Sequence, residues 1–400
     1  MQILQIGDIH AREQDLPEVM KCLETVYQTA SLEKPGIIIN TGDTFDNRNI
    51  RLDSETARQV FRFFSRLSEI APVAILIGTP SHDGLSAKIL DHGSFGHGMI
   101  VSDRPEQLSL IEGDLYTIDD LPQGDDSAEI EAIISMVPQP TKQFWQSDSD
   151  IKTTDEEISN ALTGLFAGFG AQAEEFDCPH ILAFHGSIRG ATISTGQVMI
   201  GRDIEISKEQ IGLANADLVC CGHIHKMQYI EPNIYYQGSL WRTDFGEMEA
   251  KGFLVHDLLP EGRESHFVET PTRKLMKLDY DFTRDGVVPV VGCPTEGMDG
   301  VHLRVNIRVW QDEADRHSVE EITKLYMDGG CEQVYVKIIR VPRETVRSEK
   351  ILKLTSLREK IQERAALAGE DVAESILRKC DVLETTDSDD VVGGVTVYLE

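Results

Sequence analysis

Five short apolar runs in the first two-thirds of the chain each lead directly into residues that bind metal ions. The runs cover residues 3–6, 37–39, 73–77, 181–184 and 218–221. Each run is short, rich in β-branched or other apolar side chains, and bounded by polar residues or glycine, which predicts buried strands. Amphipathic stretches with apolar residues at helical spacing lie between them, around residues 16–23, 60–70 and 158–169. This alternation predicts an α/β fold in which helices cover sheets.

The polar residues after these runs form five motifs. They are Asp8-Ile9-His10, Gly42-Asp43-Thr44-Phe45-Asp46, Gly78-Thr79-Pro80-Ser81-His82-Asp83, His185-Gly186 and Gly222-His223-Ile224-His225. In α/β sheets, ligand sites gather where the carboxyl ends of strands open into loops. Alternate side chains of an extended segment point to the same side, so Asp8 and His10 can bind one ion together. By the same argument, His223 and His225 can share one ion or reach two adjacent ions. The two oxygens of Asp43 can bridge two cations.

The motifs favour a particular class of metal site. Two cations about 3.5–4 Å apart form a clamp suited to in-line displacement at phosphorus. Mixed imidazole and carboxylate ligands without thiolate suit Mn, Fe or Zn, and we expect Mn. The alternative, that these are ordinary core histidines and loop aspartates, does not explain why all five motifs follow strands. The histidines outside the motifs fit no such pattern, and we expect them on the surface or in the core; they are His92, His97, His180, His256, His266, His302 and His317.

Composition narrows the class of protein without identifying a substrate. The seven cysteines include no C-x-x-C pair, which argues against a disulfide framework and a thiolate zinc site. No apolar run approaches the roughly 20 residues needed to span a bilayer, and no signal-peptide pattern is present, so we expect a cytoplasmic protein that does not bind membranes. The net charge of −30 argues against a broadly basic surface for nucleic acid. Residues 112–177 hold 16 of the acidic residues against Lys142 and Lys152, and that stretch can face away from such a ligand.

The pattern changes near Pro271. Residues 302–309 and 334–341 alternate like strands, and Ser318 with Glu321 forms a capping box for a helix that should stop at Gly329-Gly330. These elements predict a small α+β unit. After about Arg347, apolar residues recur at helical spacing until a polar acidic segment at residues 385–390. The predicted domain boundaries therefore give residues 1–270, 271–345 and 346–400.

The ordered motifs resemble those of the calcineurin-like metallophosphoesterases, which run D-x-H, G-D, G-N-H-D, H and G-H-x-H. Within that superfamily the chain looks most like the SbcD-type nucleases, the bacterial counterpart of the MRN-complex nuclease. Residues 185–191 resemble the H-G-x-x-x-G-A stretch of those nucleases, and residues 237–247 resemble their P-G-S…R-x-D-F-G-E stretch. The resemblance is strong over residues 1–260. From there to about residue 345 it lies only in the arrangement of the expected elements, and beyond that it is weak.

The resemblance implies a sandwich of β-sheets flanked by helices, followed by a small α+β capping domain and C-terminal helices. Residues 1–270 would then be the nuclease domain and residues 271–345 a capping domain that binds DNA. Residues 346–400 would be a helical segment that binds an ATPase partner and ends in an acidic tail.

The resemblance also implies roles for single residues. Asp8, His10 and His225 would bind one metal ion, His185 and His223 the other, and Asp43 would bridge them. His82 would contact the scissile phosphate and assist the leaving group, Asp83 would orient His82, and Asp46 would support the ligands. Arg189 and Arg242 would bind substrate. The family has a metal-binding Asn directly before the motif histidine, where this chain has Ser81, so Ser81 or a water would complete a weaker second site.

The predicted function is a two-metal Mn nuclease that works with an SbcC-like ATPase in DNA double-strand-break repair. The resemblance implies exonuclease action at DNA ends and endonuclease action on single strands or hairpins. Two alternatives remain: a small-substrate phosphodiesterase of the same fold, and a weakly active subunit that tethers DNA ends. We expect a homodimer through helices near residues 54–70 and 84–95. Helices at about residues 348–383 are expected to dock on the ATPase.

Overall fold

The computed structural model describes residues 1–93, 95–118, 129–140, 155–194, 204–247, 249–283, 297–316, 318–342 and 349–385. The chain separates into two compact units. The first comprises Met1–Ile307 with His317–Ile338, and the second comprises Arg308–Arg316 with Ile339–Glu400. The domain boundaries proposed from the sequence, after residues 270 and 345, stay predictions.

Two β-sheets form the larger part of the first unit. Among the described residues, the first sheet has six strands in the order β15 (Gly262–Glu269), β14 (Gly252–Leu259), β1 (Gln2–Ile6), β2 (Ile37–Asn40), β3 (Val73–Leu76) and β4 (Met99–Ser102). Strands β1 to β4 run parallel, whereas β14 is antiparallel to β1 and to β15. The carboxyl ends of β1, β2 and β3 therefore open at one edge.

The second sheet has seven strands within the described part of the chain. Their order is β12 (Gln228–Glu231), β13 (Ile234–Tyr236), β11 (Leu218–Gly222), β8 (His180–His185), β7 (Ile130–Val137), β5 (Glu106–Ile111) and β6 (Asp114–Thr117). Strands β7, β8, β11 and β13 are parallel, and the remaining pairs are antiparallel. A short parallel pair, β9 (Ser187–Ile188) and β10 (Glu205–Ile206), follows β8.

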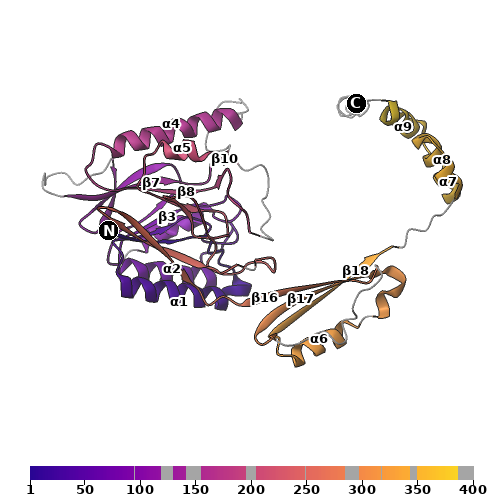
Figure 1. The fold of residues 1–400 in the computed structure, drawn as a ribbon, viewed down its shortest axis with the longest axis horizontal. Helices are drawn as coiled ribbons and strands as arrows, with labels where there is room; N and C mark the ends of the chain where they lie inside the picture. The colour runs from indigo at the N-terminus through magenta and orange to yellow at the C-terminus, as the bar shows by residue number, and fades with distance from the viewer. Residues whose placement is uncertain are drawn as a thin grey trace. The chain divides into compact units, whose positions relative to one another are not determined.

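The sheets pack face to face, and helices cover their outer faces (Figure 1). Buried side chains from both sheets, such as Ile39 and Leu76 from the first and Ile134 and Ala183 from the second, form the core between them. Helices α1 (Leu16–Glu33) and α2 (Glu55–Ser68) cover the first sheet, and α4 (Asp155–Ala173) and α5 (Lys208–Gly212) cover the second. This layering confirms the predicted α/β class with sheets flanked by helices.

Local sequence explains where several helices begin. The side chain of Ser54 accepts the amide of Ala57 at the start of α2, and Ser207 with Gln210 forms a capping box at the start of α5. Thr154, which with Glu157 forms a capping-box pattern ahead of α4, lies outside the described residues. Two short 3-10 helices, η1 (Glu13–Asp15) and η2 (Leu85–His92), follow the loops after β1 and β3.

The C-terminal third holds a separate small sheet. Strands β16 (Lys274–Asp281), β17 (Val301–Trp310) and β18 (Gln333–Val341) form it, with η4 (Gln311–Arg316) and α6 (Val319–Asp328) between β17 and β18. The Ser318 cap and the stop at Gly329 are confirmed. Helices α7 (Glu349–Lys353), α8 (Leu357–Ala368) and α9 (Glu374–Thr385) follow. No helix in the described residues is long and apolar enough to cross a membrane.

Candidate metal centre

The loops after β1 and β2 are fastened together by their backbones. The amide of Asp8 donates to the carbonyl of Gly42, and that of His10 donates to the carbonyl of Asp43, both at 2.9 Å. A Cβ atom on Gly42 would lie 2.6 Å from His185 Nδ1 and 2.8 Å from the Gly78 Cα, so only glycine fits between these loops. The motif glycine therefore permits the close approach that brings the ligand side chains together.

Three predicted ligands of the first ion converge. Donor atoms of Asp8, His10 and His225 all lie within 4.8 Å of one another, and the three residues are buried. The Nε2 atoms of His10 and His225 are 2.9 Å apart. Two imidazole nitrogens at this distance either share a proton or direct their lone pairs at one cation. The second arrangement matches the ligand roles expected from the motifs.

A second cluster joins Asp43, His185 and His223, whose donor atoms also lie within 4.8 Å of one another. His185 Nε2 is 3.4 Å from Asp43 Oδ2. The same carboxylate oxygen is 3.8 Å from His10 Nε2 in the first cluster. Asp43 therefore lies between the clusters, as a bridging ligand must.

Hydrogen bonds fix the ring orientation of one histidine in each cluster. His185 Nδ1 is 2.6 Å from the carbonyl oxygen of Thr41, so it carries the proton and donates it. His225 Nδ1 is 2.8 Å from Glu247 Oε1, which accepts its proton in the same way. In both rings the lone pair is thus left on Nε2, the atom that faces the cluster.

The backbone around the centre is strained at the ligands themselves. The described part of the chain contains seven non-glycine residues with positive φ, and four of them are Asp8, His10, Asp43 and His223. Such conformations cost free energy and persist where surrounding structure enforces them, commonly at functional sites. This concentration at predicted ligands indicates that the loops are shaped for the site and not only for the fold.

The charges of the centre favour a bound cation. Burial raises the pKa of Asp8 and lowers the pKa of His10 well below its ordinary value. Burial also opposes protonation of His185, but the adjacent Asp43 carboxylate raises its pKa to about 9. His10 is therefore available as a neutral ligand, whereas the acidic charge near His185 attracts a positive charge. Divalent cations would satisfy that attraction and leave the imidazoles neutral.

His82 lies at the rim of the first cluster, and with His10 and Asp46 it forms a third group whose donor atoms lie within 4.8 Å of one another. Its ring packs edge-on against that of His10 at a centroid distance of 4.7 Å. His82 Nδ1 is 3.2 Å from the carbonyl oxygen of Asp46, which leaves Nε2 for another partner. The Asp46 carboxylate lies 3.8 Å from His10 Nδ1. His82 is half-buried, consistent with access to a substrate.

Asp83 does not orient His82 as the resemblance implied. Its buried carboxylate accepts the amide of Phe45 at 3.0 Å on one oxygen, and the amides of Gly78 and Thr44 at 3.0 and 3.1 Å on the other. Asp83 thus connects the loops after β2 and β3, and the Asp46 carbonyl is the group that orients His82. Burial raises the pKa of Asp83 to about 6.

The structure also differs from the prediction at Ser81. Ser81 is exposed, and its carbonyl oxygen accepts the amide of Arg48 at 3.1 Å. The hydroxyl that faces the second cluster belongs to Thr79. Thr79 Oγ1 is 3.0 Å from Asp43 Oδ2, 3.3 Å from His185 Nε2 and 3.4 Å from His223 Nδ1.

The two arginines expected to bind substrate have different surroundings. Arg189 is exposed and lies 3.9 Å from Glu205. Arg242 donates from its guanidinium to the carbonyls of Arg273 and Glu249 at 2.9 and 3.0 Å. Those contacts give Arg242 a structural role in fastening its loop, and substrate binding by Arg189 stays a prediction.

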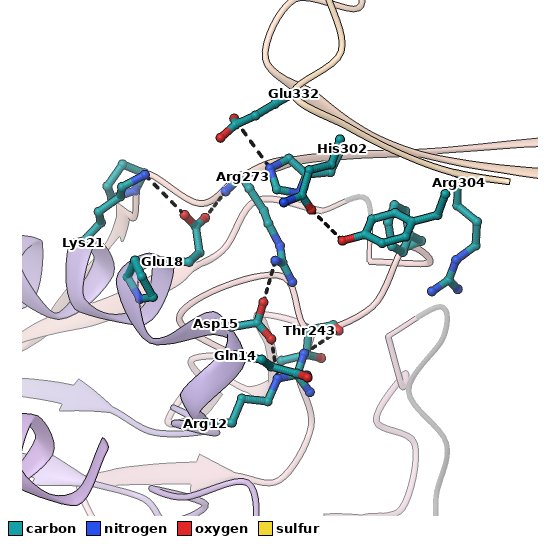
Figure 2. A pocket seen from close by; sticks show the side chains of 15 residues that line it. Arg12, Gln14, Asp15, Glu18, Lys21, Thr243, Arg273, His302, Arg304 and Glu332 are labelled. Atoms are coloured by element: carbon teal, nitrogen blue, oxygen red, sulfur yellow. Dashed lines mark hydrogen bonds and ion pairs between the residues drawn. The ribbon is translucent and has the colours of Figure 1, made fainter. Parts of the chain in front are cut away.

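A pocket of about 550 Å³ includes Arg12, and Figure 2 shows the side chains that line it. Its basic side chains are Arg12, Lys21, Arg273, His302 and Arg304, its acidic ones are Asp15, Glu18 and Glu332, and Phe245 and Tyr335 are aromatic. Arg12 and Arg273 both donate to Asp15, and both lie over the Trp241 ring, at 5.0 and 5.1 Å. Arg12 also reaches 3.6 Å from Asp46, which connects the pocket to the first cluster.

Sequence reasoning gave no role to several residues that support the ligands. Gln237 donates to Asp8 Oδ2 at 3.1 Å, and Glu247 fixes His225 while pairing with the buried Lys251 at 3.3 Å. Burial alone would raise the pKa of Glu247, but His225 and Lys251 lower it to about 2. Gln237 and Glu247 are the first and last residues of the stretch 237–247. Its resemblance to the nuclease stretch was the sequence feature that could have indicated their role.

The donor set fits a pair of divalent cations. Asp8, His10 and His225 would hold one ion, Asp43 would be shared, and His185 and His223 would hold the other. Two cations there would neutralise charge that develops on a phosphoryl group under attack by water. The chain's own contribution is to orient the imidazoles of His185 and His225 and to present His82 at the rim.

Comparison with known proteins gives one family and several similar solved structures. The family profile described as calcineurin-like phosphoesterase matches residues 1–227. Comparison with curated proteins gives no match. Similar solved structures include a dimetal phosphatase from Danio rerio, at 10% identity over 68% of this chain and 99% of that one, with a TM-score of 0.42. Another is an archaeal phosphodiesterase, at 12% identity over 67% of this chain and 100% of that one, with a TM-score of 0.30.

Proposed function

Because the chain belongs to the calcineurin-like phosphoesterase family, we propose that it is the manganese-dependent nuclease subunit of an SbcCD-type complex that processes DNA ends. Metal-dependent hydrolysis of phosphoesters follows from the family and from the groups of candidate metal-binding residues that contain the motif ligands. The proposal adds the metal, the substrate and the partners. Imidazole and carboxylate ligands without thiolate are compatible with Mn.

The observation that carries the step from a phosphoester to a nucleic acid is the pocket of Figure 2. The whole chain has a net charge of −30, yet this pocket gathers four Lys or Arg side chains and one histidine against three acids. Basic groups beside a catalytic centre suit a polyanionic backbone that continues past the scissile bond. A small phosphodiester has no such continuation to bind.

The aromatic residues of the pocket add a second reason. Phe245 and Tyr335 lie edge to face at 5.8 Å, and the Arg304 guanidinium lies 4.2 Å from the Phe245 ring centre. Aromatic and guanidinium faces next to basic groups are the surfaces on which unpaired bases stack. The pocket would then accept the strand that leads away from the metal centre.

The test compares two substrates with Mn²⁺ present. The proposal expects hydrolysis of a linear DNA duplex or hairpin, and an Arg304→Ala variant that loses DNA affinity several-fold with a weaker dependence on salt. Hydrolysis of bis(p-nitrophenyl) phosphate should be unchanged in that variant. Rapid cleavage of the chromogenic diester with no cleavage of any DNA would favour a small-substrate phosphodiesterase. DNA binding without cleavage of either substrate would favour an end-tethering subunit.

The proposed homodimer rests on an exposed apolar patch beside α2. Leu52, Leu85 and Phe95 are 50%, 72% and 70% exposed, and Leu52, Phe61 and Ile89 line a hollow of about 250 Å³. Apolar exposure of this kind commonly marks a protein interface. Light scattering at micromolar concentration should give a dimer mass for the wild type and a monomer mass for Phe95→Asp. A monomeric wild type would contradict this part of the proposal.

The proposed ATPase contact rests on α8 and α9. Arg358 connects the two helices through ion pairs with Asp381 at 2.6 Å and Glu374 at 2.9 Å. Leu367, Ile376 and Leu383 nevertheless remain about half exposed (55%, 48% and 48%). An amphipathic helix that docks in a partner's groove buries residues of this kind. Ile376→Asp should abolish co-purification with an SbcC-like ATPase while Mn-dependent hydrolysis by the subunit alone persists.

A further inference from the structure

A fourth donor atom lies beside those of Asp43, His185 and His223, which are the predicted ligands of the second ion. The fourth is Thr79 Oγ1, which lies 3.0–3.4 Å from an oxygen of Asp43 and from ring nitrogens of His185 and His223. Atoms bound tetrahedrally to one ion at 2.0–2.2 Å are about 3.4 Å from one another. Thr79 Oγ1 donates a hydrogen bond to Asp43 Oδ2, and its spacing from the two ring nitrogens is compatible with ligands that share one ion.

The loop after β3 holds Thr79 at this place. The Thr79 amide donates to Asp43 Oδ1 at 2.5 Å, and a Cβ atom on Gly78 would lie only 2.2 Å from the Asp43 amide nitrogen. Pro80 follows, and a residue before proline is restricted to extended conformations. The β-branched side chain of Thr79 adds a restricted χ1 angle. Gly78 thus allows the loop to approach Asp43 closely, and Pro80 restricts the backbone conformation of Thr79 at that place.

We propose that Thr79, and not Ser81, supplies the fourth ligand of the second metal ion. The hydroxyl takes the place that an asparagine amide has in the family pattern, reached from a position two residues earlier in the loop. A neutral hydroxyl is a poorer donor than an amide carbonyl, so the second ion is the more weakly bound of the two. The inference rests on the metal site of the proposed function and is independent of whether the substrate is DNA.

Calorimetric titration of the metal-free protein with Mn²⁺ tests the assignment. Wild type should show a tighter and a weaker binding event. Thr79→Val, which keeps the shape and the backbone contact to Asp43, should weaken the second event by about 10-fold or more and leave the first unchanged. Thr79→Ser and Ser81→Ala should both titrate like wild type. Circular dichroism of each metal-free variant checks that the fold is intact.

A change of ligand chemistry gives a second readout that does not depend on activity. A thiolate prefers soft cations, so Thr79→Cys should bind Cd²⁺ at least about 10-fold more tightly than wild type. It should also show thiolate-to-cadmium charge-transfer absorbance, which Ser81→Cys should lack. In calorimetry, the proposal is overturned if Thr79→Val keeps both Mn²⁺ events, if Ser81→Ala alone loses the second event, or if wild type binds a single ion. In the cadmium experiment, it is overturned if the absorbance appears with Ser81→Cys and not with Thr79→Cys.

Discussion

Buried histidines occur in two regions of the sheet sandwich, and their neighbours give them opposite properties. His185, at the end of β8, lies against the Asp43 carboxylate, and this raises its pKa to about 9 although burial opposes protonation. His256, inside β14, is equally buried, and burial lowers its pKa to about 3. Its partners are the neutral side chains of Gln5 at 2.9 Å and Ser265 at 2.7 Å.

The two regions are connected by a chain of amide groups. His256 Nε2 lies beside Gln5 Oε1, Gln5 donates to Gln237 Oε1 at 2.7 Å, and Gln237 donates to Asp8 Oδ2 at 3.1 Å. The chain ends on a predicted ligand, whereas His256 itself is packed in the core. The comparison teaches that burial alone does not make a histidine functional. What distinguishes His185 is the carboxylate beside it and its position at the end of a strand.

The largest effect is expected at the rim of the metal centre. Replacing His82 with Ser should lower the rate of Mn-dependent hydrolysis by about 100-fold or more, because the group proposed to contact the substrate is lost. Metal content should stay at the wild-type level, since the clusters of Asp8, His10 and His225 and of Asp43, His185 and His223 remain. Steady-state kinetics and elemental analysis of the purified variant measure the two quantities.

His97 offers a matched control for that substitution. Its Nδ1 also lies beside a backbone carbonyl, that of Gly113 at 2.8 Å, but it belongs to none of the clusters among the described residues. His97→Ser should hydrolyse at the wild-type rate. Loss of both metal ions in His82→Ser would show instead that His82 is a ligand and that the division between rim and clusters is wrong.

Removal of the metal ions should affect the stability that depends on His185 and leave the region around His256 unaffected. The clusters bury Asp8 and Asp43 among imidazoles, so a bound cation stabilises the folded chain by about 2.7 kcal/mol when its free concentration is 100 times its Kd. Thermal unfolding with Mn²⁺ or with EDTA should show this difference for the wild type and for His256→Gln. His185→Asn should lose part of it. An equal response of His185→Asn and wild type would place the cation elsewhere.

A smaller effect is expected behind the first cluster. Glu247→Gln should weaken the tighter Mn²⁺ event by about 10- to 100-fold, because a neutral amide makes His225 a less basic ligand. The weaker event should be unaffected, since His185 is oriented by the backbone carbonyl of Thr41, which no substitution removes. Calorimetry distinguishes the two events. Equal weakening of both would show that Glu247 acts through the fold, for example through its buried pair with Lys251.

Much of this arrangement could be predicted from the sequence. The strands ahead of Asp8, Asp43 and His185 are short apolar runs with clear ends, so their positions and the convergence of the side chains after them followed from periodicity. Ser318 and Gly329 marked both ends of α6 because capping depends on adjacent residues alone. Strand ends and helix caps could be predicted because they depend on residues that are adjacent in the sequence.

The remainder depended on contacts between distant segments. Counting back from His82 placed Ser81 in the ligand position, but the loop reaches the cluster at Thr79 because Gly78 packs on Asp43. The partner of Asp83 was misjudged for the same reason: its carboxylate accepts amides from the neighbouring loop, and adjacency to His82 does not imply contact. Spacing along one loop does not reveal which of its atoms face another.

The last effect concerns stability and pH at His256. Its pKa is about 3 in the folded chain against an ordinary 6.5, so between these values the unfolded chain binds a proton that the folded chain does not. The free energy of unfolding therefore rises with pH across this window, by up to about 1.4 kcal/mol per pH unit from this residue. The contribution is complete above pH 6.5 and is lost as the pH falls toward 3. His256→Gln keeps a donor for Gln5 but does not titrate, so urea unfolding of the metal-free proteins from about pH 7 to pH 5 should give a shallower pH dependence for the variant. Carboxylates contribute equally to both proteins, and the difference between the two slopes isolates the histidine. Identical slopes would mean that His256 is protonated in the folded core, and the contrast with His185 would then disappear.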